Sequence, residues 1–262
     1  MIRGISAKVD FAFFRNLVIR QIRQDYLENL TGFAWLILQP LLLLAVYAFV
    51  FTTIFRSRIP DSEVEFVPYL AVAFWPWTAF SESILKASSA ITSNSGLIGK
   101  VAFATVQLPL ACVTATFLMN LVGYLAVLAV LQLLGTDIHW LFLPVLLPVL
   151  VLLWIFACAI ALFASALRVF VRDTAQILPP LMTFWFFTTP ILYSHAHLPE
   201  RIAHWLSWNP MTWFVGQTRE LLLFGRLTLG SELLLAVVLV GLIAWLSWRF
   251  FGRFSDHFED FL

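Results

Sequence analysis

Apolar residues are gathered into long stretches along the chain, and short polar segments separate them. The stretch from Thr31 to Phe55 contains no Asp, Glu, Lys or Arg. As a helix it would be roughly 37 Å long, more than the ~30 Å hydrocarbon core of a bilayer. Five later stretches are also long and poor in charge. We therefore predict six membrane-spanning helices, at residues of about 33–55, 66–86, 104–134, 140–167, 174–194 and 232–250.

A different pattern precedes the first span, in residues 1–30. Apolar side chains recur there at helical spacing, whereas Arg20, Arg23 and Gln24 fall on the opposite face. The pattern predicts an amphipathic helix lying along the cytoplasmic surface of the membrane. An ordinary solvated helix is the alternative. The apolar stripe consists of Phe11, Phe14, Val18, Ile22 and Tyr26.

The distribution of Lys and Arg predicts the orientation of these helices. With the N-terminus inside, 11 of the 16 Lys and Arg residues lie on cytoplasmic segments and 5 on external ones. Basic residues favour the cytoplasmic side of a membrane. Both termini are therefore expected in the cytoplasm, with residues 31–262 forming one multi-pass membrane domain.

The cytoplasmic connection at residues 86–101 is longer than a simple chain reversal requires. It is rich in small and polar residues, and glycines flank its short apolar centre, Leu97 and Ile98. A short helix that offers an apolar tip to a partner is one interpretation. A plain polar loop is the other.

The external connection at residues 194–230 predicts two short helices. Asn209 and Pro210 suit the N-cap and first position of the second helix, and Gly225 suits its end. Tryptophans on both helices favour an interfacial or re-entrant position. Arg219 and Glu220 imply a water-filled cavity or a position at the lipid headgroups. Anchoring without any gating role stays open.

Composition excludes a soluble protein. Hydrophobic residues make up 61% of the chain and charged residues 12%, and the mean hydropathy is +0.90. Both cysteines, Cys112 and Cys158, lie inside apolar runs, which indicates buried packing residues and not a disulfide.

Enzymatic signatures are missing from the sequence. Residues 96–100 have the wrong spacing for a phosphate-binding loop, and Val101 stands where Ser or Thr is needed. No metal site or nucleophile motif is found, so we expect neither an enzyme nor a cofactor in this chain. The acidic residue within the second span, Glu82, lies near its cytoplasmic end and is expected to be paired there.

Aromatic residues make up 16% of the chain and cluster on the first, second and fifth spans. Their faces can stack on sugar rings, so a wall of them suits a sliding polysaccharide. Packing against lipid is the alternative for most of them. The candidates for a substrate pathway are Trp35, Tyr47, Phe51, Trp75, Trp77, Phe184, Trp185 and Tyr193.

The order of several short motifs resembles the transmembrane subunit of type-2 ATP-binding-cassette exporters, in the branch that exports O-antigen, teichoic acid or capsule. The resemblance covers nearly the full length. The motifs are Tyr26 with Gly32 and Trp35, Gln39-Pro40, Asn94 to Lys100 before Leu108-Pro109-Leu110, Phe170 with Arg172-Asp173, Gln176-Ile177-Leu178, Pro190-Ile191 with Tyr193, and Trp208-Asn209-Pro210.

This resemblance implies an all-α permease in the bacterial inner membrane that works as a homodimer with two separate P-loop ATPase subunits. ATP and Mg would bind to the ATPases, the cargo would be a lipid-linked polysaccharide, and a nucleic-acid partner is not expected. A coupling helix at 93–101 would contact the ATPase, and helices within 199–224 would form an external gate. The coupling candidates are Ser95, Gly96, Leu97, Ile98, Gly99 and Lys100. The gate candidates are Trp208, Asn209, Pro210, Arg219 and Glu220.

Two other functions remain open on the sequence. The same fold could export a small drug or lipid. A membrane-embedded enzyme acting on lipid-linked sugars is the third hypothesis, although no constellation of catalytic residues supports it.

Overall fold

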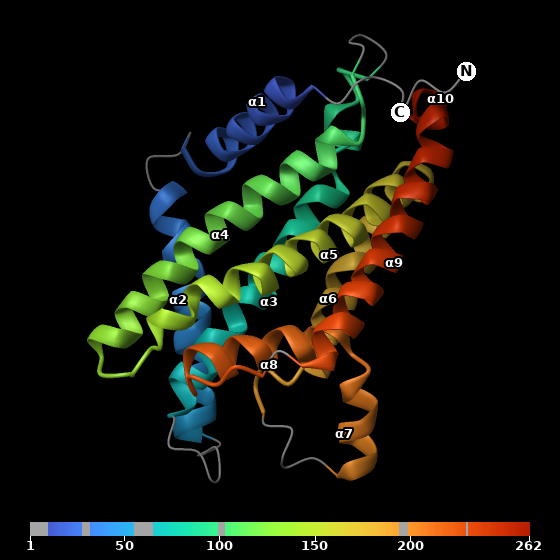
Figure 1. Cartoon of the computed structure of the whole chain (residues 1–262). Helices are drawn as coiled ribbons and strands as arrows, with labels where there is room; N and C mark the ends of the chain where they lie inside the picture. The colour runs from blue at the N-terminus through green and yellow to red at the C-terminus, as the bar shows by residue number, and fades with distance from the viewer. Residues whose placement is uncertain (1–9, 28–31, 55–64, 99–102, 194–198, 229) are drawn as a thin grey trace.

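A computed structural model describes residues 10–27, 32–54, 65–98, 103–193, 199–228 and 230–262 (Figure 1). Within these ranges the chain forms helices and turns and no strands, as predicted for an all-α protein. The α-helices are α1 (Phe11–Ile22), α2 (Gly32–Phe49), α3 (Phe66–Ser88), α4 (Gln107–Leu133), α5 (Leu143–Phe170), α6 (Thr174–Thr188), α7 (Glu200–Ser207), α8 (Pro210–Leu222), α9 (Ser231–Phe254) and α10 (Phe258–Phe261).

The bundle is built around α3, which contacts α2, α4, α5, α6 and α8. Helix α9 packs along α5, and α1 packs along α4. Helix α8 crosses the bundle at one end, and α7 projects away from it there. Helices α1 and α10 lie at the opposite end (Figure 1).

Three segments of the described chain are long and apolar enough to cross a membrane, judged by length and composition: Gln107–Leu133, Trp140–Phe170 and Ser231–Phe261. They coincide with the third, fourth and sixth predicted spans. The other three predicted spans correspond to α2, α3 and α6. Helix α2 continues as a π-helical turn at Val50–Ile54, and α3 carries Glu82 and Lys86. The arrangement of six spans therefore stays a prediction.

The predicted fifth span is too long. We expected a helix over 174–194, but α6 has 15 residues and ends at Thr188. The next residue, Thr189, is extended, with φ −98° and ψ 134°. It precedes Pro190, and the ring of a proline disfavours helical geometry in the residue before it. Residues 190–193 form a turn instead of a last helical turn.

Helical structure extends beyond the fourth and sixth predicted spans. Helix α5 continues to Phe170 and not 167, and helical structure after α9 continues through α10. The reason is an aromatic cluster at this end of the bundle. The ring of Phe170 packs against Phe254, Phe258 and Phe261, with centroids 4.9 to 5.9 Å apart. Contact between these rings stabilises the extra turns.

The N-terminal amphipathic helix begins at Phe11, after Asp10 caps it by accepting a hydrogen bond from the Ala12 N–H at 2.8 Å. Its buried side chains are Leu17 and Val18. Phe11 of the predicted stripe is 77% exposed in the single chain, so this side chain is free to face the membrane surface. The helix continues as a π-helical turn at Arg23–Leu27.

Candidate functional site

The predicted coupling helix has a different local structure in its described part. A 3-10 helix at Thr92–Asn94 is followed by turns through Ile98, and Gly99 and Lys100 lie outside the described residues. The run of Ser and Thr explains the difference. The Ser93 hydroxyl donates to the Ser89 carbonyl at 2.6 Å, and such local bonds compete with regular helix.

The four described coupling candidates occupy these turns. Gly96 is exposed, whereas Ser95, Leu97 and Ile98 are half-buried. Ile98 packs against the core of the bundle. The apolar centre of the segment is therefore shared between the bundle and the surface.

Helix α1 is tied directly to this segment. Arg20 Nη2 donates to Asn94 Oδ1 at 2.7 Å, and Asn94 Nδ2 donates to the Ala90 carbonyl at 2.8 Å. The rings of Phe13 and Phe103 pack with centroids 5.3 Å apart. A displacement of the 92–98 segment would therefore also act on α1.

A polar network joins α1, α3 and α4 near the same end of the bundle. Lys86 Nζ lies 2.8 Å from Glu82 Oε1 and 3.4 Å from Asp25 Oδ2. Asn120 Nδ2 donates to Glu82 Oε2 at 2.9 Å, and Gln21 Nε2 donates to Asp25 Oδ1 at 3.0 Å. Glu82 is thus paired, as the sequence predicted.

Three pathway candidates are core residues of the single chain. Trp75 is 1% exposed and Trp77 is 5% exposed. Trp185 is half-buried, and its ring packs edge-on against Phe80 and Phe156 at 5.3 and 6.1 Å. Trp77 and Trp185 pack α3, α5 and α6 together, whereas Trp75 lies against Gly123 of α4.

The other pathway candidates differ in exposure. Trp35 on α2 is 50% exposed and Phe184 on α6 is 67% exposed. Tyr47 is half-buried against rings of α3 and α6. The Tyr193 hydroxyl donates to the Phe187 carbonyl at 3.0 Å. The side chain of Phe51 lies outside the described residues.

Asn209 joins α8 to the end of α6. Its side-chain oxygen accepts from the Met211 N–H at 3.0 Å, which caps α8, and from Trp185 Nε1 at 2.8 Å. Its Nδ2 donates to the Thr189 hydroxyl at 2.9 Å. Pro210 follows in the first turn, so the predicted cap is confirmed. Trp208 beside it is exposed.

Arg219 on α8 is the most constrained of the gate candidates. It is 5% exposed, and its guanidinium donates to three backbone carbonyls: Tyr69 at 3.1 Å, Pro190 at 2.7 Å and Ile191 at 2.7 Å. The guanidinium carbon also lies 3.5 Å from the centroid of the Tyr69 ring. One side chain therefore joins α8 to α3 and to the turn after α6.

The cavity predicted for Arg219 is not seen, because backbone carbonyls enclose its side chain. The carbonyls of the turn at 190–191 have no hydrogen-bond donor from a helix backbone. The Arg219 guanidinium donates to them instead. Helix α8 lies outside the predicted spans. Burial lowers the pKa of the Arg219 guanidinium to about 10, and the guanidinium therefore stays charged at neutral pH. Glu220 next to it is half-buried.

Comparison with known proteins identifies this arrangement. Residues 13–223 match the profile of the ABC-2 type transporter family. The chain belongs to this family. The ABC-2 match includes α1, the 92–98 segment and α8, so all three regions described above are parts of the family fold.

Relatives of this ABC-2 chain align over most of their length. An O-antigen export system permease protein RfbA of Myxococcus xanthus is 31% identical over 254 residues, which cover 94% of this chain and 92% of the relative. An RfbA of Klebsiella pneumoniae is 26% identical and covers 86% of both chains. The polysialic acid transport protein KpsM of Escherichia coli is 26% identical and covers 83% of both.

Membership of the ABC-2 family confirms that the chain is a transport subunit and not an enzyme. The family and the apolar helices α4, α5 and α9 together make it a multi-pass membrane protein. In the part of the chain that the structure describes, no group of three His, Cys, Asp or Glu could hold a metal ion.

Sequence reasoning missed Asp25, Lys86 and Asn120 as members of one network. One signal was present. Asn120 is a polar side chain inside a 36-residue stretch without charge, and such residues within membrane helices usually pair with one another. Its partner on α3 could not be identified from spacing.

Proposed function

We propose that this chain is the permease subunit of an ATP-driven exporter that moves a lipid-linked polysaccharide, such as O-antigen, across the bacterial inner membrane. The observation that carries the proposal is the alignment with the Myxococcus O-antigen permease over 94% of the chain. The likeness to a polysialic acid transport protein supports a polysaccharide cargo more generally.

In the membrane, α2, α3, α4, α5, α6 and α9 supply the six spans, and α1 lies at the cytoplasmic surface. Both termini face the cytoplasm. Two observations support this orientation. The excess of Lys and Arg falls on the segments assigned to the inside, and α1 lies at the same end of the bundle as α10 (Figure 1).

The working unit is a homodimer with two P-loop ATPase subunits, which bind ATP and Mg. Residues 93–101, with Ser95 to Lys100 at the centre, contact the ATPase. The exposed apolar faces of α2 and α6 have to be covered in the membrane, either by lipid or by a second copy of the chain. These faces contain Leu38, Leu42, Val46, Ile177, Leu181 and Phe184.

The cargo passes along aromatic residues that ATP-driven movement uncovers in part. Trp35 and Phe184 are accessible already, which supports their contact with sugar rings. Helices α7 and α8 form the external gate, and the bonds of Arg219 and Asn209 support its closed position in this conformation.

The proposal is tested in the organism that encodes the chain. Deleting the gene should abolish surface polysaccharide, and restoring it together with its ATPase should recover the polymer on gels of surface extracts. The purified permease alone should hydrolyse no ATP and should copurify with a P-loop protein. Normal surface polymer in the deletion strain, or polymer export without any ATPase, would overturn the proposal.

A further inference from the structure

Helix α3 has a proline in its middle. Pro76 has no backbone N–H, so the carbonyl of Val72, four residues earlier, has no partner within the helix. Val72 is fully buried and Trp75 nearly so. Bulk water and lipid do not reach a carbonyl at such a position, and leaving it unpaired is costly.

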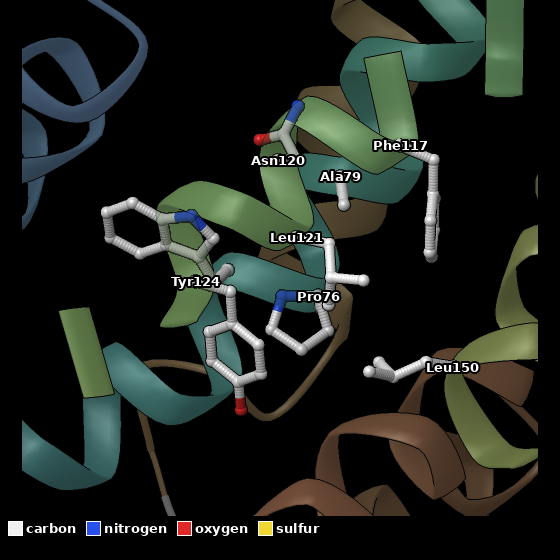
Figure 2. Close-up of a pocket in the computed structure, with 8 residues that line it drawn as sticks. Pro76, Ala79, Phe117, Asn120, Leu121, Tyr124 and Leu150 are labelled. Carbon is white, nitrogen blue, oxygen red and sulfur yellow. The ribbon is translucent and has the colours of Figure 1, made fainter. Parts of the chain in front are cut away.

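The missing bond is supplied from α4. The Tyr124 hydroxyl donates to the Val72 carbonyl at 3.1 Å, and Tyr124 is itself 3% exposed. Figure 2 shows Pro76 and Tyr124 together on the wall of one small pocket. The hydroxyl thus replaces, from a neighbouring helix, the hydrogen bond that the proline removes.

A very small pocket lies beside the proline. The pocket has a volume of about 10 Å³, close to the size of one water molecule, and α3, α4 and α5 all line it. Ala79, Leu121 and Leu150 are among its lining residues (Figure 2). The buried Trp75 Nε1 has no hydrogen-bond partner, so this part of the α3–α4 contact is not fully satisfied.

Both ends of α3 are held by polar contacts. At the outer end Arg219 Nε donates to the Tyr69 carbonyl. At the other end Glu82 and Lys86 contact Asn120 and Asp25, and the 92–98 segment follows within a few residues. A relative movement of these ends must be absorbed between Tyr69 and Glu82, where Pro76 lies.

The prolines of α6 lie in different surroundings from Pro76. Pro179 and Pro180 are the sixth and seventh residues of their helix, and both are exposed. Pro76 is buried, central and matched by a donor from another helix.

We infer that α3 changes its bend at Pro76 during the transport cycle, and that Tyr124 is a positioning residue that holds the conformation described here through the Val72 carbonyl. The inference rests on the proposed function, since it assigns a moving part to the same exporter. The inference predicts that the Tyr124 hydroxyl stabilises α3 only while position 76 lacks an N–H.

The test compares Tyr124→Phe, Pro76→Ala and the double variant in the permease–ATPase complex. Amide hydrogen exchange in α3 is the first readout. Tyr124→Phe should speed exchange by about fivefold, as the loss of one hydrogen bond predicts. In the Pro76→Ala background the same substitution should change exchange by less than twofold, because the new N–H at position 76 bonds to Val72.

Transport is the second readout. Tyr124→Phe should lower the polysaccharide exported per ATP hydrolysed by about fivefold while the complex still assembles. Thr114→Val is the matched control. It also removes a hydroxyl from α4, but that hydroxyl donates to the Leu110 carbonyl of its own helix at 2.7 Å. The control should leave export per ATP unchanged.

Equal effects of Tyr124→Phe in the two backgrounds would overturn the inference. So would slower folding or poorer assembly with an unchanged export-to-ATP ratio, because a purely structural role predicts that result. A wild-type complex that exports no polysaccharide on ATP hydrolysis would overturn the proposed function itself, before any variant is compared.

Discussion

Helices α3 and α9 have nearly the same length, 23 and 24 residues, and opposite surroundings. Helix α9 is strongly apolar and presents leucines and valines along most of its surface. Helix α3 contains Pro76, Glu82 and Lys86, yet most of its side chains are buried. Its polar groups contact α1, α4 and α8.

The difference shows what hydropathy measures in a membrane protein. A helix that touches lipid must be apolar, whereas a helix enclosed by others can carry polar groups that pair with its neighbours. Within the described chain, length and hydropathy mark α4, α5 and α9 as candidate spans and do not mark α3, although α3 lies at the centre of the bundle. We expect substitutions on α3 and its partners to change transport more than those on α9.

The largest effect is expected from Arg219→Met. It removes the donor to three buried carbonyls that join α8, α3 and the 190–191 turn. We expect a loss of roughly 3 kcal/mol in stability and no surface polysaccharide. Thermal melting of the purified protein, followed by size-exclusion chromatography, measures it. Arg249→Met on α9 is the control, and because Arg249 is exposed it should change stability by about 0.5 kcal/mol or less. Similar melting of both variants would contradict the role of Arg219.

The next effect compares two leucines. Leu70 on α3 is fully buried, and Leu234 on α9 is exposed. Leu70→Ala should cost about 2 kcal/mol or more by leaving a cavity, whereas Leu234→Ala should stay within about 0.5 kcal/mol. The same melting experiment measures both. A reversed order would mean that α9, and not α3, is enclosed in the assembled transporter.

A smaller effect is expected from Lys86→Gln, which removes the charge shared by Glu82 and Asp25. These side chains are partly exposed, so the loss of stability should be about 1 kcal/mol or less. Export per ATP should fall further than stability, because the network joins α1 to α3. The double variant Asp25→Lys and Lys86→Asp exchanges the two charges and should recover part of the lost export. Arg253→Gln on α9 is the matched control, and an equal loss of export there would argue against a specific network.

The smallest effect on stability is expected from Phe184→Leu and Trp35→Leu. Both residues are exposed in the single chain, so melting should change by about 0.5 kcal/mol or less. Export should nevertheless fall if these rings contact the cargo. Surface polysaccharide measured at equal permease levels tests this, and unchanged export would remove both residues from the pathway.

Local chemistry made part of this structure predictable. The uncharged runs identified α4, α5 and α9, and the Asn209–Pro210 pair identified the start of α8. Pro190 could have predicted the early end of α6, and the Ser and Thr residues at 89–95 could have predicted a 3-10 turn.

Long-range partners were not predictable in the same way. The carbonyls around Arg219 belong to residues 28 to 150 positions away. Every residue has a backbone carbonyl, so the residue types do not show which carbonyls Arg219 contacts. Pro76 predicts that the Val72 carbonyl lacks its helical hydrogen bond. The sequence around it does not indicate that the Tyr124 hydroxyl is the replacement donor. Which neighbours enclose α3 is a property of packing, and a single sequence does not specify it.

The central claim is that this chain, together with an ATPase, exports a lipid-linked polysaccharide. The most direct measurement reconstitutes the purified permease and its P-loop ATPase in proteoliposomes with labelled lipid-linked polysaccharide from the native organism. We predict ATP-dependent transfer of the polymer to the lumen that requires both proteins and stops when the P-loop lysine of the ATPase is replaced. Transfer at the same rate without the ATPase, or ATP hydrolysis that never moves the polymer, would contradict the account.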